Sequence, residues 1–174
     1  DLNKPYIALG ADLSDSERAE VLRLLDVTEE ELKDYTVATV SNEMEHEYLD
    51  SFLSAELIGS RALSSVKVVG KGKGNGIKVT TKNISYCTTG MYQNALATAG
   101  VENVDVTVAG PTSISGTAAL VGTMEAYENM TGDAIEADNV EAATNELVVT
   151  SELGETIGCL LYTSDAADDL IGVD

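Results

Sequence analysis

The stretch of sequence that decides the fold is Ser64–Ser85, SSVKVVGKGKGNGIKVTTKNIS. Its two ends, Ser64–Val69 and Ile77–Ser85, are rich in β-branched residues, and the second alternates apolar with polar side chains, so we expect two strands. The connecting segment Gly70–Gly76 holds four glycines in seven residues and ends in Asn-Gly, a composition typical of hairpin turns. We therefore predict that the two strands pair as an antiparallel hairpin, which excludes a purely parallel sheet.

Helix and strand patterns alternate on both sides of this hairpin. Ser14 with Glu17, and Thr28 with Glu31, each form the S/T-x-x-E signature of a helix that begins with a capping box. This alternation argues against an all-helical or a β-sandwich fold. We expect the other strands at Tyr6–Leu9, Thr36–Val40 and Asn103–Ala109, and the other helices at Asn42–Phe52, Thr89–Ala99, Thr117–Met130 and after Asp138.

The length and composition are those of one folded domain. The chain has 174 residues, of which 44% are hydrophobic and 23% charged. No apolar run approaches the roughly 18 residues of a membrane span, so we expect no integral membrane segment. The sequence predicts a single α+β or α/β domain over residues 1–160, with a mixed or antiparallel sheet of about five strands covered by helices. Residues 161–174 are predicted to form an acidic C-terminal tail.

Charge is distributed unevenly along the chain. The formal net charge is −20, yet Leu57–Val101 contains no acidic residue and six Lys or Arg. After Lys82 there are 15 acidic residues and no Lys or Arg. Binding to nucleic acid depends on Lys and Arg that neutralise phosphates, so we expect no nucleic-acid partner. The acidity is interpreted as a solvated surface.

The two cysteines leave two interpretations open. Cys87 and Cys159 lack the CxxC spacing of zinc ribbons and redox motifs. A Cys87–Cys159 disulfide would close a loop of about 70 residues and stabilise the fold by roughly 4 kcal/mol in the chain-entropy model. Alternatively, they are two independent buried thiols that pack as small hydrophobic side chains.

Residues for catalysis or metal binding are sparse, and we assign no catalytic residue. The single histidine, His46, lies between Glu45 and Glu47 on an expected helix, where flanking carboxylates raise its pKa and suit a surface ion pair. A transition-metal site would require His46, Cys87 and Cys159 to converge from distant segments, so we expect none. We expect no cofactor, and at most weak surface binding of Ca²⁺, because no acidic cluster has the order of an EF-hand.

One segment, Gly110–Thr117 (GPTSISGT), is a candidate ligand site. It lies between an expected strand and an expected helix, a position that presents backbone N–H groups and hydroxyls to an anion. The alternative is a capped helix start, with Ser115 as N-cap and Gly116 for close packing. Neither serine of the segment fits a G-x-S-x-G nucleophile elbow. The candidate ligand-binding residues are Ser113, Ser115 and Thr117, with Tyr92 and Asn94 as neighbours.

Four segments together resemble a bacterial family of unknown function, DUF1002, found mostly in Firmicutes. They are Ala8–Val27 (ALGADLSDSERAEVLRLLDV), Met91–Val101 (MYQNALATAGV), Gly110–Glu128 (GPTSISGTAALVGTMEAYE) and Asn145–Gly158 (NELVVTSELGETIG).

The resemblance implies an exported protein, secreted or associated with the cell envelope. The chain begins at Asp1 without a signal-like apolar stretch, so we expect that the signal peptide is already absent. The family is expected to have longer members, and it provides no catalytic residue to transfer. An oxidising compartment permits a disulfide, but relatives are expected to carry Thr where this chain has Cys87.

Two function classes follow. The first is a non-enzymatic extracytoplasmic module that binds an unknown protein or small molecule. The alternative is a hydrolase or transferase that uses the Ser113/Ser115 segment together with carboxylates.

Overall fold

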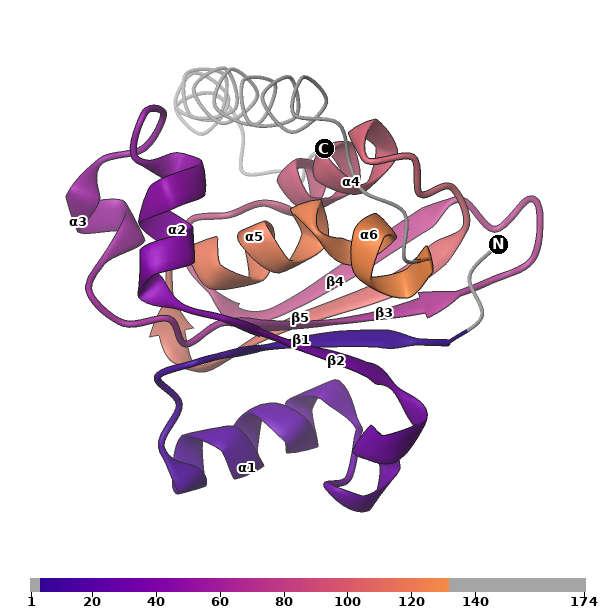
Figure 1. The fold of residues 1–174 in the computed structure, drawn as a ribbon, viewed down its shortest axis with the longest axis horizontal. Helices are drawn as coiled ribbons and strands as arrows, with labels where there is room; N and C mark the ends of the chain where they lie inside the picture. The colour runs from indigo at the N-terminus through magenta and orange to yellow at the C-terminus, as the bar shows by residue number, and fades with distance from the viewer. Residues whose placement is uncertain (1–3, 132–174) are drawn as a thin grey trace, which may run out of the picture.

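The computed structural model describes residues 4–131, which form one α+β domain around an open five-stranded sheet (Figure 1). The strand order is β2-β1-β3-β5-β4. β1 is parallel to β2 and β4 is parallel to β5, whereas β3 is antiparallel to both of its neighbours, β1 and β5. The prediction of a mixed or antiparallel sheet of about five strands is therefore confirmed, and of the two alternatives the sheet is mixed. The strands are β1 (Tyr6–Gly10), β2 (Thr36–Val40), β3 (Ser65–Gly70), β4 (Ile77–Ile84) and β5 (Val104–Ile114).

The predicted hairpin between β3 and β4 is wrong, because β5 lies between these strands. Gly70 of β3 and Ile77 of β4 both pair with Val104 of β5. The connection passes around the start of β5, where the Lys71 N–H donates to the Asn103 carbonyl at 2.8 Å. Two strand spacings are about 10 Å, and the six residues between β3 and β4 reach about 20 Å when extended. Turn composition thus predicted the reversal of direction but not the strand that fills the gap.

One face of the sheet is covered by α1 (Asp15–Leu25), which lies below the sheet in Figure 1. Both predicted capping boxes are confirmed at the level of hydrogen bonds. Ser14 Oγ accepts from the Glu17 N–H while the Ser14 N–H donates to the Glu17 carboxylate. Thr28 and Glu31 make the same reciprocal pair at the start of the 3₁₀ helix η1 (Glu30–Asp34). α1 buries Val21, Leu22 and Leu25 against Ile7, Leu9 and Ala109 of the sheet.

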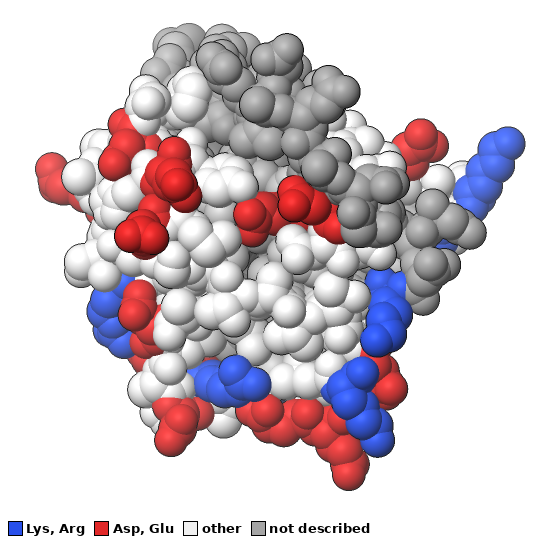
Figure 2. Space-filling view, in the orientation of Figure 1, with Lys and Arg blue, Asp and Glu red and all other residues white. Residues whose placement is uncertain are grey.

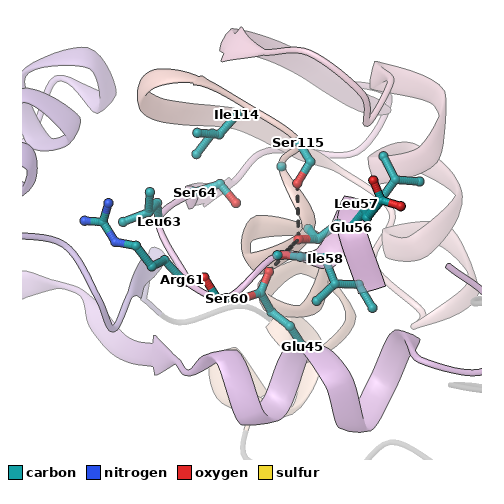
Figure 3. A pocket seen from close by; sticks show the side chains of 13 residues that line it. Glu45, Glu56, Leu57, Ile58, Ser60, Arg61, Leu63, Ser64, Ile114 and Ser115 are labelled. Carbon is teal, nitrogen blue, oxygen red and sulfur yellow. Dashed lines mark hydrogen bonds between the residues drawn. The ribbon is translucent and has the colours of Figure 1, made fainter. Parts of the chain in front are cut away.

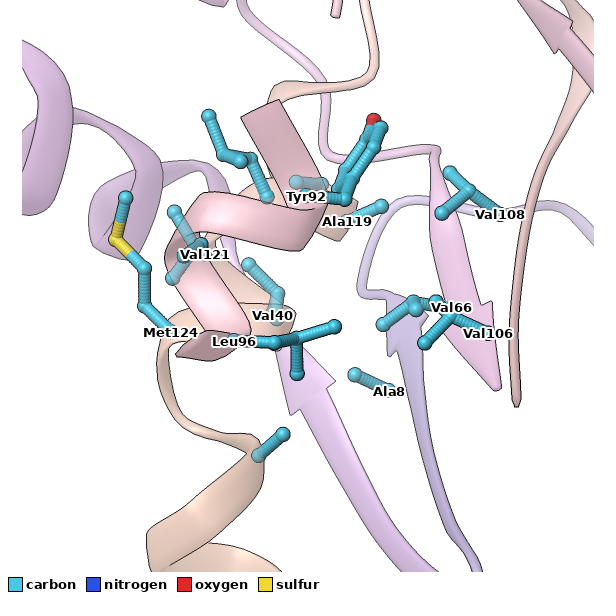
Figure 4. Packing of buried hydrophobic residues seen from close by; sticks show 14 of the residues in the cluster. Ala8, Val40, Val66, Tyr92, Leu96, Val106, Val108, Ala119, Val121 and Met124 are labelled. Carbon is cyan, nitrogen blue, oxygen red and sulfur yellow. The ribbon is translucent and has the colours of Figure 1, made fainter. Parts of the chain in front are cut away.

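The other face carries the remaining helices and the larger core (Figures 1 and 4). All eight residues of α5 are buried. A Cβ at Gly122 would lie 2.9 Å from the Cβ of Ala8 and 3.0 Å from Val66 Cγ1, so glycine permits this helix to approach the sheet closely. The Tyr6 hydroxyl donates to the Gly122 carbonyl at 3.0 Å. The helices of this face are α2 (Asn42–Leu49), α3 (Ala55–Ile58), α4 (Thr89–Thr98), α5 (Thr117–Met124) and α6 (Ala126–Thr131).

Three predicted boundaries need correction. The strand expected to end at Ala109 continues to Ile114, and its pairing with β4 jumps from Lys82–Ala109 to Ile84–Ile114. Pro111 is tolerated there because the pairing of β5 with β3 ends at Ala109, so that the missing N–H interrupts no β3 pair. The predicted helix Asn42–Phe52 ends at Leu49 as α2, and α3 follows it as a separate short helix that was not predicted. The predicted helix Thr117–Met130 is divided at Glu125 into α5 and α6.

Several predictions fall outside the described residues. They are the helix after Asp138, the boundary at residue 160, the tail 161–174 and the partner cysteine Cys159. Cys87 is 4% exposed, and its burial raises the pKa of the thiol to about 12. The disulfide stays a prediction. Within residues 4–131, no helix is both long and apolar enough to cross a membrane.

Candidate functional site: a pocket around Glu45

A pocket of about 260 Å³ opens where α2 and α3 meet the junction between β5 and α5 (Figure 3). Its wall combines carboxylate, hydroxyl and aliphatic side chains, as is usual for sites that bind small ligands. Residues far apart in the sequence contribute to it, since α2 precedes α5 by about 70 residues. The lining residues are Glu45, Glu56, Leu57, Ile58, Gly59, Ser60, Arg61, Leu63, Ser64, Ile114, Ser115, Gly116 and Thr117.

The Glu45 carboxylate is the chemical centre of the pocket. Glu45 is 1% exposed, and within residues 4–131 it is the only charged side chain that is buried. One carboxylate oxygen accepts from the Thr117 hydroxyl at 2.5 Å, and the other accepts from the Asn42 amide at 3.1 Å. Burial raises the pKa of Glu45, and these two hydrogen bonds oppose the rise only in part. The group is therefore a desolvated carboxylate held by neutral donors.

A chain of hydroxyls leads from the pocket to this carboxylate (Figure 3). Ser115 Oγ lies 3.4 Å from Thr117 Oγ1, and Thr117 Oγ1 lies next to Glu45. A threonine hydroxyl carries a single proton. Because Thr117 donates that proton to Glu45, the donor between the two hydroxyls is Ser115.

The backbone at Gly116 sets the directions of Ser115 and Thr117. Gly116 has a φ of +93°, and a Cβ there would lie 2.5 Å from the Tyr92 hydroxyl oxygen and 2.7 Å from Ile84 Cγ2. The buried Tyr92 hydroxyl donates to the Gly116 carbonyl at 2.9 Å. Only glycine fits this left-handed and crowded position. Tyr92 therefore supports the pocket from behind.

The predicted N-cap of α5, Ser115, is wrong. The N-cap residue is Gly116, and no side chain at that position caps the helix. The Ala119 N–H is satisfied from another part of the chain, by Ser64 Oγ at 2.8 Å. Ser115 turns its hydroxyl to Thr117 instead, and this frees it to line the pocket.

Arg61 lines the pocket, and His46 lies beside it, in contact with the lining residue Gly59. His46 Nδ1 lies 2.6 Å from Asp50, and its Nε2 lies 3.1 Å from the Gly59 carbonyl oxygen. Both partners only accept hydrogen bonds, so the pair of contacts favours the imidazolium. The pKa of His46 is raised, first by its hydrogen bond to Asp50 and only last by Glu45, so the predicted direction is confirmed with a different main cause. Arg61 points away from Glu45 and pairs with Glu17 at 3.0 Å.

The structure brings together only some of the residues predicted from sequence. Ser115 and Thr117 line the pocket, and Tyr92 contacts its backbone. Ser113 is exposed on β5, and Asn94 lies on α4 outside the lining. The predicted loop Gly110–Thr117 is mostly strand. As ligand contacts all five residues stay predictions, although the buried carboxylate disfavours the anion suggested by the sequence.

Three residues of the site, Glu45, Asn42 and Ser64, were not predicted from the sequence. Glu45 was considered only as a neighbour of His46 on an acidic helix, and nothing local distinguishes it from the exposed acids around it. Within residues 4–131, no group of three or more His, Cys, Asp or Glu side chains is arranged to hold a metal ion. Weak Ca²⁺ binding stays a prediction.

Comparisons with known proteins place the chain in a family without assigning an activity. The family model described as "Protein of unknown function (DUF1002)" matches residues 9–172. The chain belongs to this family. An "Uncharacterized protein YpuA" from Bacillus subtilis (strain 168) is 47% identical over 152 residues, which cover 87% of this chain and 51% of that relative. The DUF1002 chain thus spans about half the length of this curated relative. No solved structure matches this chain.

Proposed function

We propose that this DUF1002 protein is a non-enzymatic binding module that acts outside the cytoplasmic membrane and holds its ligand in the Glu45 pocket. The observation that carries the proposal is a buried carboxylate in the wall of an open pocket. Burying a carboxylate is costly, and a carboxyl group whose pKa is perturbed by burial within a cleft is typical of functional sites. Glu45 combines the two properties.

The geometry favours binding over nucleophilic catalysis. A general base acts on a proton within about 2.6–3.2 Å. Ser115, the accessible hydroxyl, lies 3.4 Å from another hydroxyl, and Thr117 separates it from the carboxylate. Thr117 itself is 2% exposed, and its proton is held by Glu45. These contacts suit a rigid polar wall better than a nucleophile and its base.

The extracytoplasmic location is supported by the resemblance to exported members of the family. Fractionation of cells that produce the full-length protein tests this part of the proposal. We expect the protein in the medium or the envelope fraction, with a cytoplasmic marker enzyme as the control. A protein found only with the cytoplasmic marker would contradict the location and leave the pocket as a binding site.

Binding at the pocket is tested by screening chemically diverse small fragments with protein-observed NMR. We expect binders that shift the amide signals of Gly59, Ser115 and Gly116, and we expect Glu45→Gln to weaken them. Glu43→Gln is the matched control, because Glu43 lies on the same helix, is exposed and loses the same charge. A screen whose binders all shift amides elsewhere would refute the pocket. Turnover of ester or amide substrates that is lost in Ser115→Ala would favour the hydrolase alternative.

A further inference from the structure

We infer that the Glu45 pocket binds a primary alkylammonium group, carried by a small free amine or by the lysine side chain of a polypeptide. The inference rests on the proposed function and names the chemical class of its ligand. Two observations support it: the buried carboxylate makes no direct ion pair within residues 4–131, and several oxygen atoms converge next to it.

Glu45 makes no direct ion pair within the described residues, and the neighbouring His46, whose charge lowers the pKa of Glu45, pairs with Asp50 at 2.6 Å. Its two hydrogen-bond donors, Thr117 and Asn42, are both neutral. Arg61 is the one Lys or Arg in the pocket wall, and it is committed to Glu17 at 3.0 Å. A buried charge is stabilised when an opposite charge approaches it with good hydrogen bonds. The ion pairs of residues 4–131 all involve other carboxylates: Arg18–Glu29, Arg23–Glu20, His46–Asp50, Arg61–Glu17 and Lys71–Asp105.

The oxygen atoms around Thr117 match the donors of an ammonium group. Thr117 Oγ1 lies 2.5 Å from Glu45 Oε2, 3.4 Å from Ser115 Oγ and 3.5 Å from the Ile58 carbonyl oxygen. The single proton of Thr117 satisfies only one of these oxygens. A carboxylate has about four lone-pair sites, and an ammonium group has three N–H donors and no acceptor. A ligand with N–H donors therefore complements this cluster, whereas an anion is repelled by Glu45.

The rest of the pocket suits an aliphatic chain. Leu57, Leu63 and Ile114 contribute aliphatic side chains to the wall of the pocket, whose volume is about 260 Å³. On the face shown in Figure 2, acidic side chains form separate groups with Lys and Arg among them rather than one continuous patch.

The test compares three ligands of equal chain length on the unmodified chain: n-butylammonium, n-butanol and n-butyrate, titrated at neutral pH and constant ionic strength. Amide shifts of Gly59, Ser115 and Gly116 report binding at the pocket. We expect n-butylammonium to bind at least about tenfold more tightly than n-butanol, and n-butyrate to cause no shift there. Constant ionic strength removes differences in screening.

Variants then connect the charge preference to Glu45. We expect Glu45→Gln to lower the affinity for n-butylammonium about tenfold and to leave n-butanol unchanged, while Glu43→Gln changes neither. The ligand series needs no variant, so the inference is tested even if Glu45→Gln does not fold. Two peptides with an acetylated N-terminus and an amidated C-terminus distinguish the sources: Gly-Gly-Lys-Gly-Gly, and the same peptide acetylated on the lysine side chain. Binding of the unmodified peptide but not of the lysine-acetylated one assigns a polypeptide lysine, and binding of n-butylammonium with neither peptide assigns a free amine.

Equal affinity for n-butanol and n-butylammonium, or a preference for n-butyrate, would overturn the ammonium inference and leave the pocket as a binding site. Absence of pocket shifts with all three ligands and with the lysine peptide would overturn it as well. In that case the fragment screen decides the broader proposal: a pocket binder of other chemistry supports it, and a screen with no pocket binder refutes both.

Discussion

The N-termini of α1 and α5 satisfy their backbone groups in opposite ways. At α1, Ser14 and Glu17 exchange hydrogen bonds within three residues of sequence, in contact with solvent. At α5, the cap residue is Gly116, and Ser64 supplies the bond to the Ala119 N–H from 55 residues away. A helix start that is completed locally needs only its own sequence. A helix start completed from a distance ties two segments together, and at α5 both of these segments line the pocket.

The largest expected effect is at Gly116. We predict that Gly116→Ala lowers the free energy of unfolding by roughly 2–4 kcal/mol, because the new Cβ combines a left-handed backbone with contacts of 2.5 and 2.7 Å. Gly74→Ala is the matched control, since Gly74 has a φ of +95° and open space around it. It should cost only the backbone strain of about 1–2 kcal/mol. Urea denaturation measures both, and equal losses would show that crowding at Gly116 is unimportant.

The two caps are compared directly by alanine substitution. Ser64→Ala leaves the buried Ala119 N–H without its partner, and we expect a loss of about 1–3 kcal/mol. Ser14→Ala removes an exposed cap and should cost about 1 kcal/mol. Thermal or urea unfolding provides the comparison. If Ser14→Ala proves the more damaging of the two, the long-range cap contributes less than its geometry indicates.

A smaller expected effect is a difference in how Glu45, in the pocket, and Glu17, at the start of α1, change the stability of the fold with pH. The pKa of Glu45 is raised, mainly by burial, so the folded protein binds its proton more strongly than the unfolded chain. Glu45 therefore stabilises the fold below its unfolded pKa of about 4.3, and that contribution is lost as the pH rises through the folded pKa. The pKa of Glu17 is lowered, first by the hydrogen bond from the Ser14 N–H. Its contribution is present above the unfolded pKa and is lost as the pH falls through the folded pKa.

The measurement is the free energy of unfolding of the natural chain minus that of each Glu→Gln variant, followed between about pH 3 and 8. We expect this difference to decrease with rising pH for Glu45→Gln and to increase for Glu17→Gln. This test depends only on the opposite pH dependence of the two differences, so it requires no pKa value for either carboxyl group. Two parallel profiles would contradict the contrast between a buried and an exposed carboxylate.

Sequence patterns predicted a structural feature correctly wherever that feature depends on residues close together in the sequence. Both capping boxes and the β-branched strands follow from residues within a few positions of each other. The hairpin fails for the opposite reason: glycines at 70–76 allow the chain to reverse, but pairing with β5 depends on residues 30 positions away. The same limit applies to the pocket, where Ser115, Thr117 and Tyr92 were candidates and Glu45 was not. In sequence, Glu45 is one acid among several on α2.

The sequence by itself determined a single domain of helices and about five strands, with a sheet either mixed or antiparallel. It also determined the reciprocal hydrogen bonds of Ser14 with Glu17 and of Thr28 with Glu31, the surface pairing of His46 and the membership of the DUF1002 family. Only the tertiary structure decided that β5 separates β3 from β4, that Ser64 caps α5, and that Glu45 alone among the described charged residues is buried. The reason is the range of the interactions. Helix caps and strand alternation depend on neighbours in sequence, whereas desolvation of a carboxylate depends on everything that packs around it.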